Sequence, residues 1–227
     1  MSVAVIIPAL NEGLAIGATV RGIPRDLVRD VIVVDNGSTD DTRERALDAG
    51  ARVVREDRRG YGSACLAGIA ALASDAEIVV FMDGDASDDP AMFEALVAPI
   101  RDGRADFVVG SRSLGNAEPG SITPQQVFGN AIASAWLRLR YGLPATDLGP
   151  FRAISRDALR SLDMRDPDYG WTVEMQIKAA RKRLRYGEIA VPYRRRIGVS
   201  KVSGTVRGTI LASVKIVGHL MWHDLVR

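Results

Sequence analysis

The sequence lacks the features typical of disulfide-bonded, membrane-spanning and nucleic-acid-binding proteins. It contains one cysteine, Cys65, so no disulfide can form within the chain and nothing indicates an oxidising compartment. No apolar run reaches the roughly 18 residues of a membrane-spanning helix. The formal net charge of +2 provides no global field for binding nucleic acid. Since the first residues lack the cationic region and cleavage site of a signal peptide, we expect a cytoplasmic protein.

With 227 residues, of which 47% are hydrophobic and 26% charged, the chain can bury the core of one soluble domain. Apolar, β-favouring runs alternate with helical patterns, which predicts an α/β fold with a mostly parallel sheet flanked by helices. We expect the domain to span 1–204 and an amphipathic helix to occupy 205–227. Strands are expected at 3–8, 31–35, 51–55, 78–82, 107–110, 151–154 and 189–193. Helices are expected at 13–21, 42–49, 62–73, 91–101, about 124–141 and around 173–181, with Ser38 or Thr39 capping the second.

A pair of acidic residues at one strand end carries the first functional prediction. Asp83 and Asp85 flank Gly84 directly after the apolar run 78–82. Two carboxylates this close repel one another unless a cation lies between them, and such oxygen ligands suit Mg²⁺ or Mn²⁺. A solvent-facing acidic turn would have the same pattern, so the metal site needs support from the rest of the chain.

Other predicted strands also end in polar or charged residues. These are Asn11 and Glu12 after the first strand, Asp35 on the second, and Ser111 and Arg112 on the fifth. Parallel strands project their carboxyl ends to one side of the sheet, where open α/β sheets bind their ligands. The coincidence therefore predicts a shared cleft for a metal ion and a phosphate-bearing ligand.

Several motifs occur together in an order that resembles a known family. They are Ile7-Pro8-Ala9-Leu10-Asn11-Glu12, Val33-Val34-Asp35-Asn36-Gly37-Ser38-Thr39-Asp40, Gly60-Tyr61-Gly62-Ser63-Ala64, Asp83-Gly84-Asp85 and Gly110-Ser111-Arg112. This set resembles glycosyltransferase family 2, which has the GT-A nucleotide-sugar fold. Within that family, the chain is most similar to the group of dolichol-phosphate mannosyltransferases and polyprenyl-phosphate glucosyltransferases.

The resemblance implies a binding site for a nucleoside-diphosphate sugar and a divalent cation. The donor nucleotide would contact Pro8, Ala9, Asn11, Glu12, Asp35, Gly37, Tyr61, Gly62 and Asp83. Asp83 and Asp85 would hold Mg²⁺ or Mn²⁺, which acts as a Lewis acid on the leaving nucleoside diphosphate. Some relatives have a third metal ligand where this chain has Ser87, followed by Asp88 and Asp89, so the remaining ligands stay open.

The second half of the chain is expected to bind the acceptor. The resemblance implies that cations bind the diphosphate and a phosphate acceptor. These are Arg112, Arg152, Arg196 and Lys201. It also implies that Trp171 packs against the sugar or the acceptor. A hydroxyl acceptor instead needs a general base, for which Asp147 and Glu174 are the candidates. The segment 123–130 carries no cation, unlike many lipid-phosphate relatives, and this favours the hydroxyl acceptor.

These observations lead to a main hypothesis and an alternative. The main hypothesis is an inverting, metal-dependent glycosyltransferase that moves a hexose from a UDP-glucose or GDP-mannose type donor to polyprenyl phosphate. In that case the basic block at 181–207 and the helix at 205–227 would contact the inner face of the membrane, or the helix would pair with a second copy of the chain. The alternative uses the same donor chemistry on a soluble hydroxyl acceptor in a small-metabolite or natural-product pathway.

Two other classes of function share some of these features. A sugar-nucleotide pyrophosphorylase would need a Gly-rich loop with Lys or Arg after the first strand, which residues 8–12 do not provide. A non-catalytic nucleotide-binding regulator is a further alternative, and such a protein would release no nucleoside diphosphate.

Overall fold

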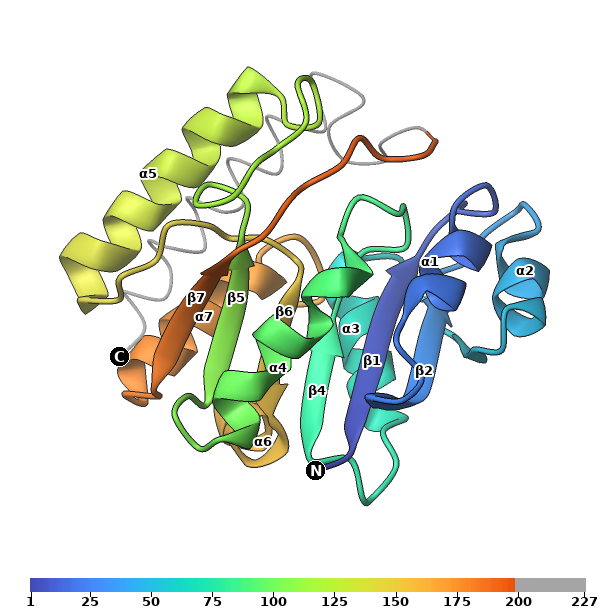
Figure 1. Cartoon of the computed structure of the whole chain (residues 1–227), viewed down its shortest axis with the longest axis horizontal. Coiled ribbons are helices and arrows are strands. Elements are labelled where there is room, and N and C mark those ends of the chain that lie inside the picture. The colour runs from blue at the N-terminus through green and yellow to red at the C-terminus, as the bar shows by residue number, and fades with distance from the viewer. Residues whose placement is uncertain (199–227) are drawn as a thin grey trace.

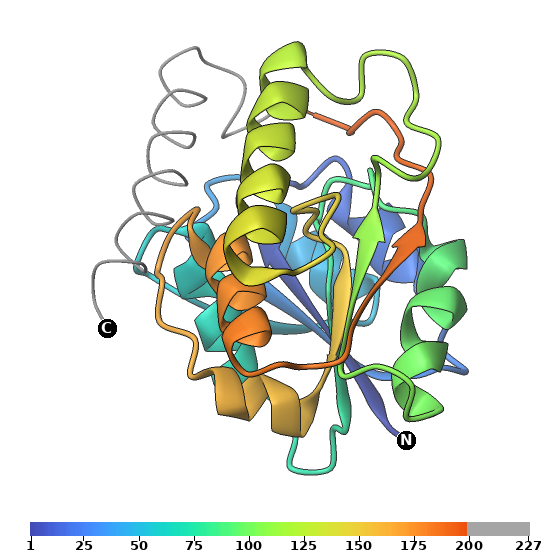
Figure 2. The same ribbon diagram turned by 90° about the vertical axis from the view of Figure 1, so that its left-hand side faces the viewer.

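The computed structural model describes residues 1–198, which form a seven-stranded sheet with helices on both faces (Figures 1 and 2). The strands are β1 (Val3–Ala9), β2 (Val28–Asp35), β3 (Arg52–Arg55), β4 (Ile78–Phe81), β5 (Phe107–Ser111), β6 (Arg152–Ser155) and β7 (Tyr186–Ala190). They follow the order β3-β2-β1-β4-β6-β5-β7. Within this sheet, β6 runs antiparallel to β4 and β5, whereas the other pairings are parallel. The predicted mostly parallel α/β fold is therefore confirmed.

Helices cover the two faces of the sheet and one end of the molecule. They are α1 (Ile16–Gly22), α2 (Thr42–Asp48), α3 (Tyr61–Ala70), α4 (Phe93–Arg101), α5 (Pro124–Tyr141), α6 (Arg156–Leu162) and α7 (Trp171–Arg181), together with a 3-10 turn at Pro90–Met92. Residues of α1 and α4 pack into the core on one face, and residues of α3, α6 and α7 pack into the core on the other. No helix within residues 1–198 is long and apolar enough to cross a membrane.

Two apolar cores form because successive side chains of a strand point to opposite faces of the sheet. In β4, Val80 packs into the core beneath α1 and α4, whereas Val79 and Phe81 pack into the core beneath α3 and α7. All three side chains are fully buried. Burying one such side chain stabilises the fold by about 1.5–3 kcal/mol. A strand buried on both faces explains why the run before the acidic pair is continuously apolar.

Some elements differ from the sequence-based expectation. The last strand spans Tyr186–Ala190, not 189–193, and Tyr193 instead forms isolated bridges with Asp88 and Ala117. Helix α6 was not predicted. Neither Ser38 nor Thr39 caps α2, because the carboxylate of Asp40 accepts the hydrogen bond from the Thr42 backbone. Lys201 and the predicted helix at 205–227 lie outside the described residues.

The antiparallel strand β6 changes which loops reach the ligand side of the sheet. The parallel strands send their following loops to this carboxyl edge. Because β6 runs the other way, the segment that precedes it, residues 143–151, reaches the same edge (Figure 1). The long excursion from Arg112 through α5 to Phe151 therefore begins and ends beside the carboxyl end of β5.

Candidate active site

The loops after β1 and β2 are joined into one unit at the carboxyl edge. The Asn11 backbone N–H donates to Ser38 Oγ at 2.9 Å, and the Thr39 N–H donates to Asn11 Oδ1 at 2.7 Å. Asn11 has φ 52°, a left-handed conformation that asparagine tolerates better than most residues. The Glu12 N–H donates to Thr42 Oγ1 at 2.8 Å. Residues predicted to bind the nucleotide thus lie in a preformed loop pair.

Asp35 and Asn36 connect this loop pair to the start of α3. Asp35 is 6% exposed, and its Oδ1 accepts the Ser38 N–H at 2.8 Å. Asn36 Oδ1 accepts the Gly60 N–H at 2.9 Å, and its Nδ2 donates to the Glu56 and Arg58 carbonyls. Sequence reasoning missed Asn36, although its place beside Asp35 in the motif was a usable signal. Gly37, which follows it, has φ 80°, a conformation that glycine adopts without strain.

The loop after β4 gathers three carboxylates. Asp85 is 4% exposed, and its Oδ1 accepts hydrogen bonds from the Ser87 backbone at 3.0 Å and from Ser87 Oγ at 2.5 Å. The Asp83 N–H donates to Asp88 Oδ2 at 3.1 Å. Ala86 has φ 63°, a conformation that costs an L-residue about 1–2 kcal/mol. Ser87 therefore supports Asp85. Asp88 belongs to the same cluster, although the sequence analysis did not list it as a site residue.

The electrostatics of this loop fit a bound cation. Burial, followed by the nearby charges of Asp85 and Asp88, raises the pKa of Asp83 well above its usual value. Burial also raises the pKa of Asp88 to about 7. Among residues 1–198, no three acidic, histidine or cysteine side chains converge into a ready-made cage. Mg²⁺ is commonly held by one or two carboxylates together with substrate phosphates. Asp83 and Asp85 are therefore suited to be the protein ligands of such a site.

Segment 191–198 crosses the acidic loop and brings a cation to it. The Arg194 N–H donates to the Ser87 carbonyl and the Ile197 N–H to the Asp85 carbonyl, both at 2.9 Å. Arg196 Nη2 lies 2.9 Å from Glu12 Oε1, and its Nη1 lies 3.4 Å from Asp85 Oδ2. One guanidinium thus spans the donor loops and the acidic loop, which places Glu12 and Asp85 in a common site.

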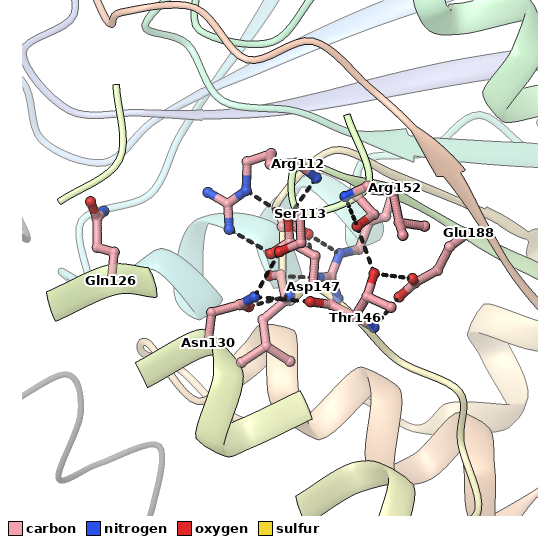
Figure 3. A network of polar contacts seen from close by, with 12 residues as sticks. Arg112, Ser113, Gln126, Asn130, Thr146, Asp147, Arg152 and Glu188 are labelled. Atoms are coloured by element: carbon pink, nitrogen blue, oxygen red, sulfur yellow. Dashed lines mark hydrogen bonds and ion pairs between the residues drawn. The ribbon is translucent and has the colours of Figure 1, made fainter. Parts of the chain in front are cut away.

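Arg112, at the end of β5, forms the third part of the site with Asp147. Arg112 Nε and Nη2 donate to the two Asp147 oxygens at 2.8 and 2.7 Å, and the Arg112 backbone N–H adds a bond of 2.7 Å (Figure 3). Asp147 is 1% exposed. The guanidinium also lies 5.0 Å from the ring centroid of Tyr193. Within residues 1–198, Arg112 Nη1 has no hydrogen-bond partner, so this end of the side chain is available to a ligand.

Arg152 and Trp171, predicted to bind the diphosphate or acceptor, and Glu174, a candidate general base, are buried in the interior. Arg152 is fully buried, and its guanidinium donates to the carbonyls of residues 148, 149 and 172. Trp171 is fully buried against Phe81. Glu174, 2% exposed, accepts the backbone N–H groups of residues 165 and 166 and pairs with Lys178. In the structure Arg152 and Glu174 spend their polar groups on backbone atoms and Lys178, and the Trp171 ring packs in the core, so all three side chains support the fold.

Tyr61 and Gly62 start α3 and pack against the loop before α7. The Tyr61 ring lies 6.1 Å from that of Trp171, and its hydroxyl is buried without a hydrogen-bond partner among the described residues. At Gly62 a Cβ would overlap the Asp166 carbonyl oxygen, and at Gly60, which has φ 140°, it would overlap the Pro167 carbonyl oxygen. In this structure the glycines permit close packing of two backbones, and Tyr61 faces the interior.

A separate hollow lies at the opposite edge of the sheet and does not compete with this site. It measures about 430 Å³ and is lined by residues around the start of β1. Its charged groups are already paired, Arg29 with Asp75 at 3.2 Å and Arg52 with Asp30 at 2.6 Å. The carboxyl edge of the sheet is better suited to a ligand, because Arg112 Nη1 is open there and the carboxylates of the acidic loop lie close together.

Comparison with known proteins agrees with this geometry. The family model for glycosyl transferase family 2 matches residues 4–163. An uncharacterized glycosyltransferase of Mycobacterium tuberculosis is 39% identical over 213 residues, covering 93% of this chain and 94% of its own. A dolichyl-phosphate hexose transferase of Haloferax volcanii is 31% identical over 211 residues, covering 92% of this chain and 90% of its own.

The solved structures extend the comparison to a complex with ligands. The crystal structure of glucosyl-3-phosphoglycerate synthase from Mycobacterium tuberculosis, in complex with Mn²⁺, UDP-glucose and phosphoglyceric acid, has a TM-score of 0.80 and 27% sequence identity. The match covers 100% of this chain and 80% of that one. The GT-A fold expected from the motifs is confirmed, and the chain belongs to glycosyl transferase family 2.

Proposed function

We propose that this protein transfers a hexose from a UDP-glucose type donor to a hydroxyl group of a small acceptor that also carries an anionic group. The observation that carries the proposal is Arg112, whose guanidinium is held by Asp147 and keeps Nη1 open beside the acidic loop. The likeness to a synthase crystallised with UDP-glucose, Mn²⁺ and phosphoglyceric acid supports the same assignment. Of the two sequence-based hypotheses, the soluble acceptor is thus better supported than polyprenyl phosphate.

The donor would occupy the loops after β1, β2 and β4. Its base would lie on the side of Pro8, Ala9 and Asn11, where a carboxylate oxygen of Asp35 can accept from a ring N–H. Asp83 and Asp85 would hold Mg²⁺ or Mn²⁺, and the bound cation would neutralise charge on the leaving nucleoside diphosphate. Arg196 already bridges Glu12 and Asp85, so its guanidinium can contact the diphosphate after a small displacement.

The acceptor would bind with its anionic group on Arg112. The guanidinium has five N–H donors, and Asp147 engages those of Nε and one of Nη2. Direct attack of the acceptor hydroxyl opposite the leaving group would invert the anomeric centre. Asp147 carries three hydrogen bonds and Glu174 binds backbone N–H groups, so we do not propose either as the base that removes the acceptor proton.

Polyprenyl phosphate is the second candidate acceptor, because α5 has an exposed apolar side. Phe128 is 70% exposed and Leu139 is 89% exposed. A lipid chain or a membrane surface, or a second copy of the chain, would bury such side chains. The dolichyl-phosphate hexose transferase at 31% identity supports this candidate.

A transfer assay separates the two acceptors. The full chain with Mn²⁺ is given radiolabelled UDP-glucose or GDP-mannose and either 3-phosphoglycerate, glycerol 3-phosphate or undecaprenyl phosphate in detergent. We expect label from UDP-glucose in a water-soluble anionic product, and a loss of transfer in Asp85→Asn. Label found only in the lipid phase would replace the first proposal by the second. No acceptor-dependent release of nucleoside diphosphate in any arm would reject both.

A further inference from the structure

We infer that Asn130, on α5, is a positioning residue that sets the orientation of Arg112 through Asp147. The inference rests on the proposed function, in which Arg112 binds the anionic group of the acceptor. Among the described residues, the Asn130 amide makes its hydrogen bonds to Ser113, Thr146 and Leu148, and none to Arg112 or to the Asp147 carboxylate. Its amide instead holds the backbone on both sides of Asp147 (Figure 3).

The contacts of the Asn130 amide use both of its ends. Nδ2 donates to the Thr146 carbonyl at 3.0 Å and to Ser113 Oγ at 3.2 Å, whereas Oδ1 accepts the Leu148 N–H at 2.9 Å. The amide therefore joins the residues before and after Asp147 to the residue after Arg112. Only a side chain with a donor and an acceptor at this spacing can satisfy all of these groups.

The segment that Asn130 holds is packed tightly under Arg112. Gly149 has no side chain at a place where a Cβ would lie 3.0 Å from the Gly110 carbonyl oxygen and 3.5 Å from Arg112 Nε. Gln176 Nε2 donates to the Asp147 carbonyl at 2.9 Å, and Glu188 accepts the Thr146 N–H at 2.9 Å. With its backbone fixed by α5, α7 and β7, the Asp147 carboxylate has little freedom, and the guanidinium bound to it is fixed in turn.

Helix α5 provides a rigid origin for this arrangement. A capping box between Thr123 and Gln126 closes its N-terminus. Ala133 and Leu137 pack on Val173 and Ile177 of α7 in a small core of their own. Asn130 lies between the cap and this core, so its amide is anchored from both directions. The cations of α5, Arg138 and Arg140, lie in its last turn, so in this proposal the helix contributes to acceptor binding through Asn130 and not through a cation.

The test measures Arg112 directly and also measures acceptor binding. The full chain is labelled with [¹⁵N]arginine, and the Arg112 Nε–H signal is assigned by its loss in Arg112→Lys. We expect this proton to exchange slowly with water in the wild type and at least tenfold faster in Asn130→Ala. Gln125→Ala, an exposed change on the same helix, is the matched control and should leave the exchange rate unchanged.

The kinetic arm compares acceptor and donor in the same variants. In Asn130→Ala we expect the KM for 3-phosphoglycerate to rise about 10- to 100-fold, by analogy with the range found when a metal-binding side chain loses its hydrogen-bond partner, with the KM for UDP-glucose within twofold. In the Arg112→Lys background the Asn130 change should add less than twofold, because both act through one guanidinium. Unchanged exchange of the Arg112 proton in Asn130→Ala would overturn the inference, as would an equal rise in both KM values. An unchanged acceptor KM in Arg112→Lys would instead refute the proposed acceptor site, while the exchange measurement still decides the role of Asn130.

Discussion

Replacing Arg152 by Met tests whether this arginine supports the fold or binds the acceptor. Its guanidinium donates to the carbonyls of Gly149 and Thr172 at 3.0 Å and of Leu148 at 2.9 Å. A buried carbonyl that loses its donor costs about 1–3 kcal/mol. Burial also lowers the pKa of Arg152, and no ion pair joins it to a carboxylate within residues 1–198, so removing the charge offsets part of this loss. We therefore expect a net destabilisation of about 3 kcal/mol.

Urea denaturation and thermal melting measure this loss. For a chain of this size, about 3 kcal/mol lowers Tm by roughly 6–12 °C. At a temperature far below the melting midpoint, the acceptor KM of Arg152→Met should stay within a few-fold of the wild type. Arg160→Met, an exposed change on α6, is the control and should leave both quantities unchanged. A variant that is as stable as the wild type but has lost acceptor binding would refute the structural role and restore the sequence-based assignment.

Three further results follow from the site. Asp85→Asn should remove the Mn²⁺-dependent part of the thermal stabilisation by UDP, which in the wild type totals about 2.7 kcal/mol at a ligand concentration of 100 Kd; a full remaining shift would locate the metal elsewhere. Gly62→Ala should lower the midpoint of urea unfolding strongly, because its Cβ would overlap the Asp166 carbonyl, whereas Gly187→Ala, with its nearest atom at 3.9 Å, should not; equal midpoints would contradict the packing described. Burial opposes the charge of Asp147, but its guanidinium partner outweighs burial and lowers the pKa. The stability that this carboxylate contributes is present at neutral pH and lost as pH falls through the lowered pKa, so the difference in unfolding free energy between wild type and Asp147→Asn should shrink in acid.

The fold and the position of the acidic loop at the carboxyl edge could be predicted because their signals are local. A continuous apolar run identifies a strand buried on both faces, and the acidic pair after it lies at the carboxyl edge whatever the other loops do. The interior positions of Arg152 and Trp171 had no such signal. An arginine satisfied by carbonyls and an arginine that binds phosphate look the same in sequence, since the difference lies in loops that fold back from elsewhere.

Asn36 and Asn130 are residues that sequence reasoning missed, because their roles depend on contacts that form only in the folded chain. Apart from the bond from Asn130 to Ser113 Oγ, each amide bonds backbone groups that lie 16–24 positions away in the chain. No periodicity marks such a residue, because most of its partners are main-chain atoms that every residue type carries. Asn36 at least stands beside Asp35 in a motif, whereas only the folded arrangement of the loops distinguishes Asn130 from a solvent-exposed asparagine.

The antiparallel strand β6 has a consequence for how such enzymes change. Residues 112–151 leave the sheet beside β5 and re-enter it at the same edge, carrying Arg112, α5 and Asp147 as one cassette. Exchanging the whole cassette between homologues leaves the strand order and the nucleotide loops of β1 and β2 untouched. Under the proposed function, recombination of this cassette would change the acceptor while the sugar donor stays the same.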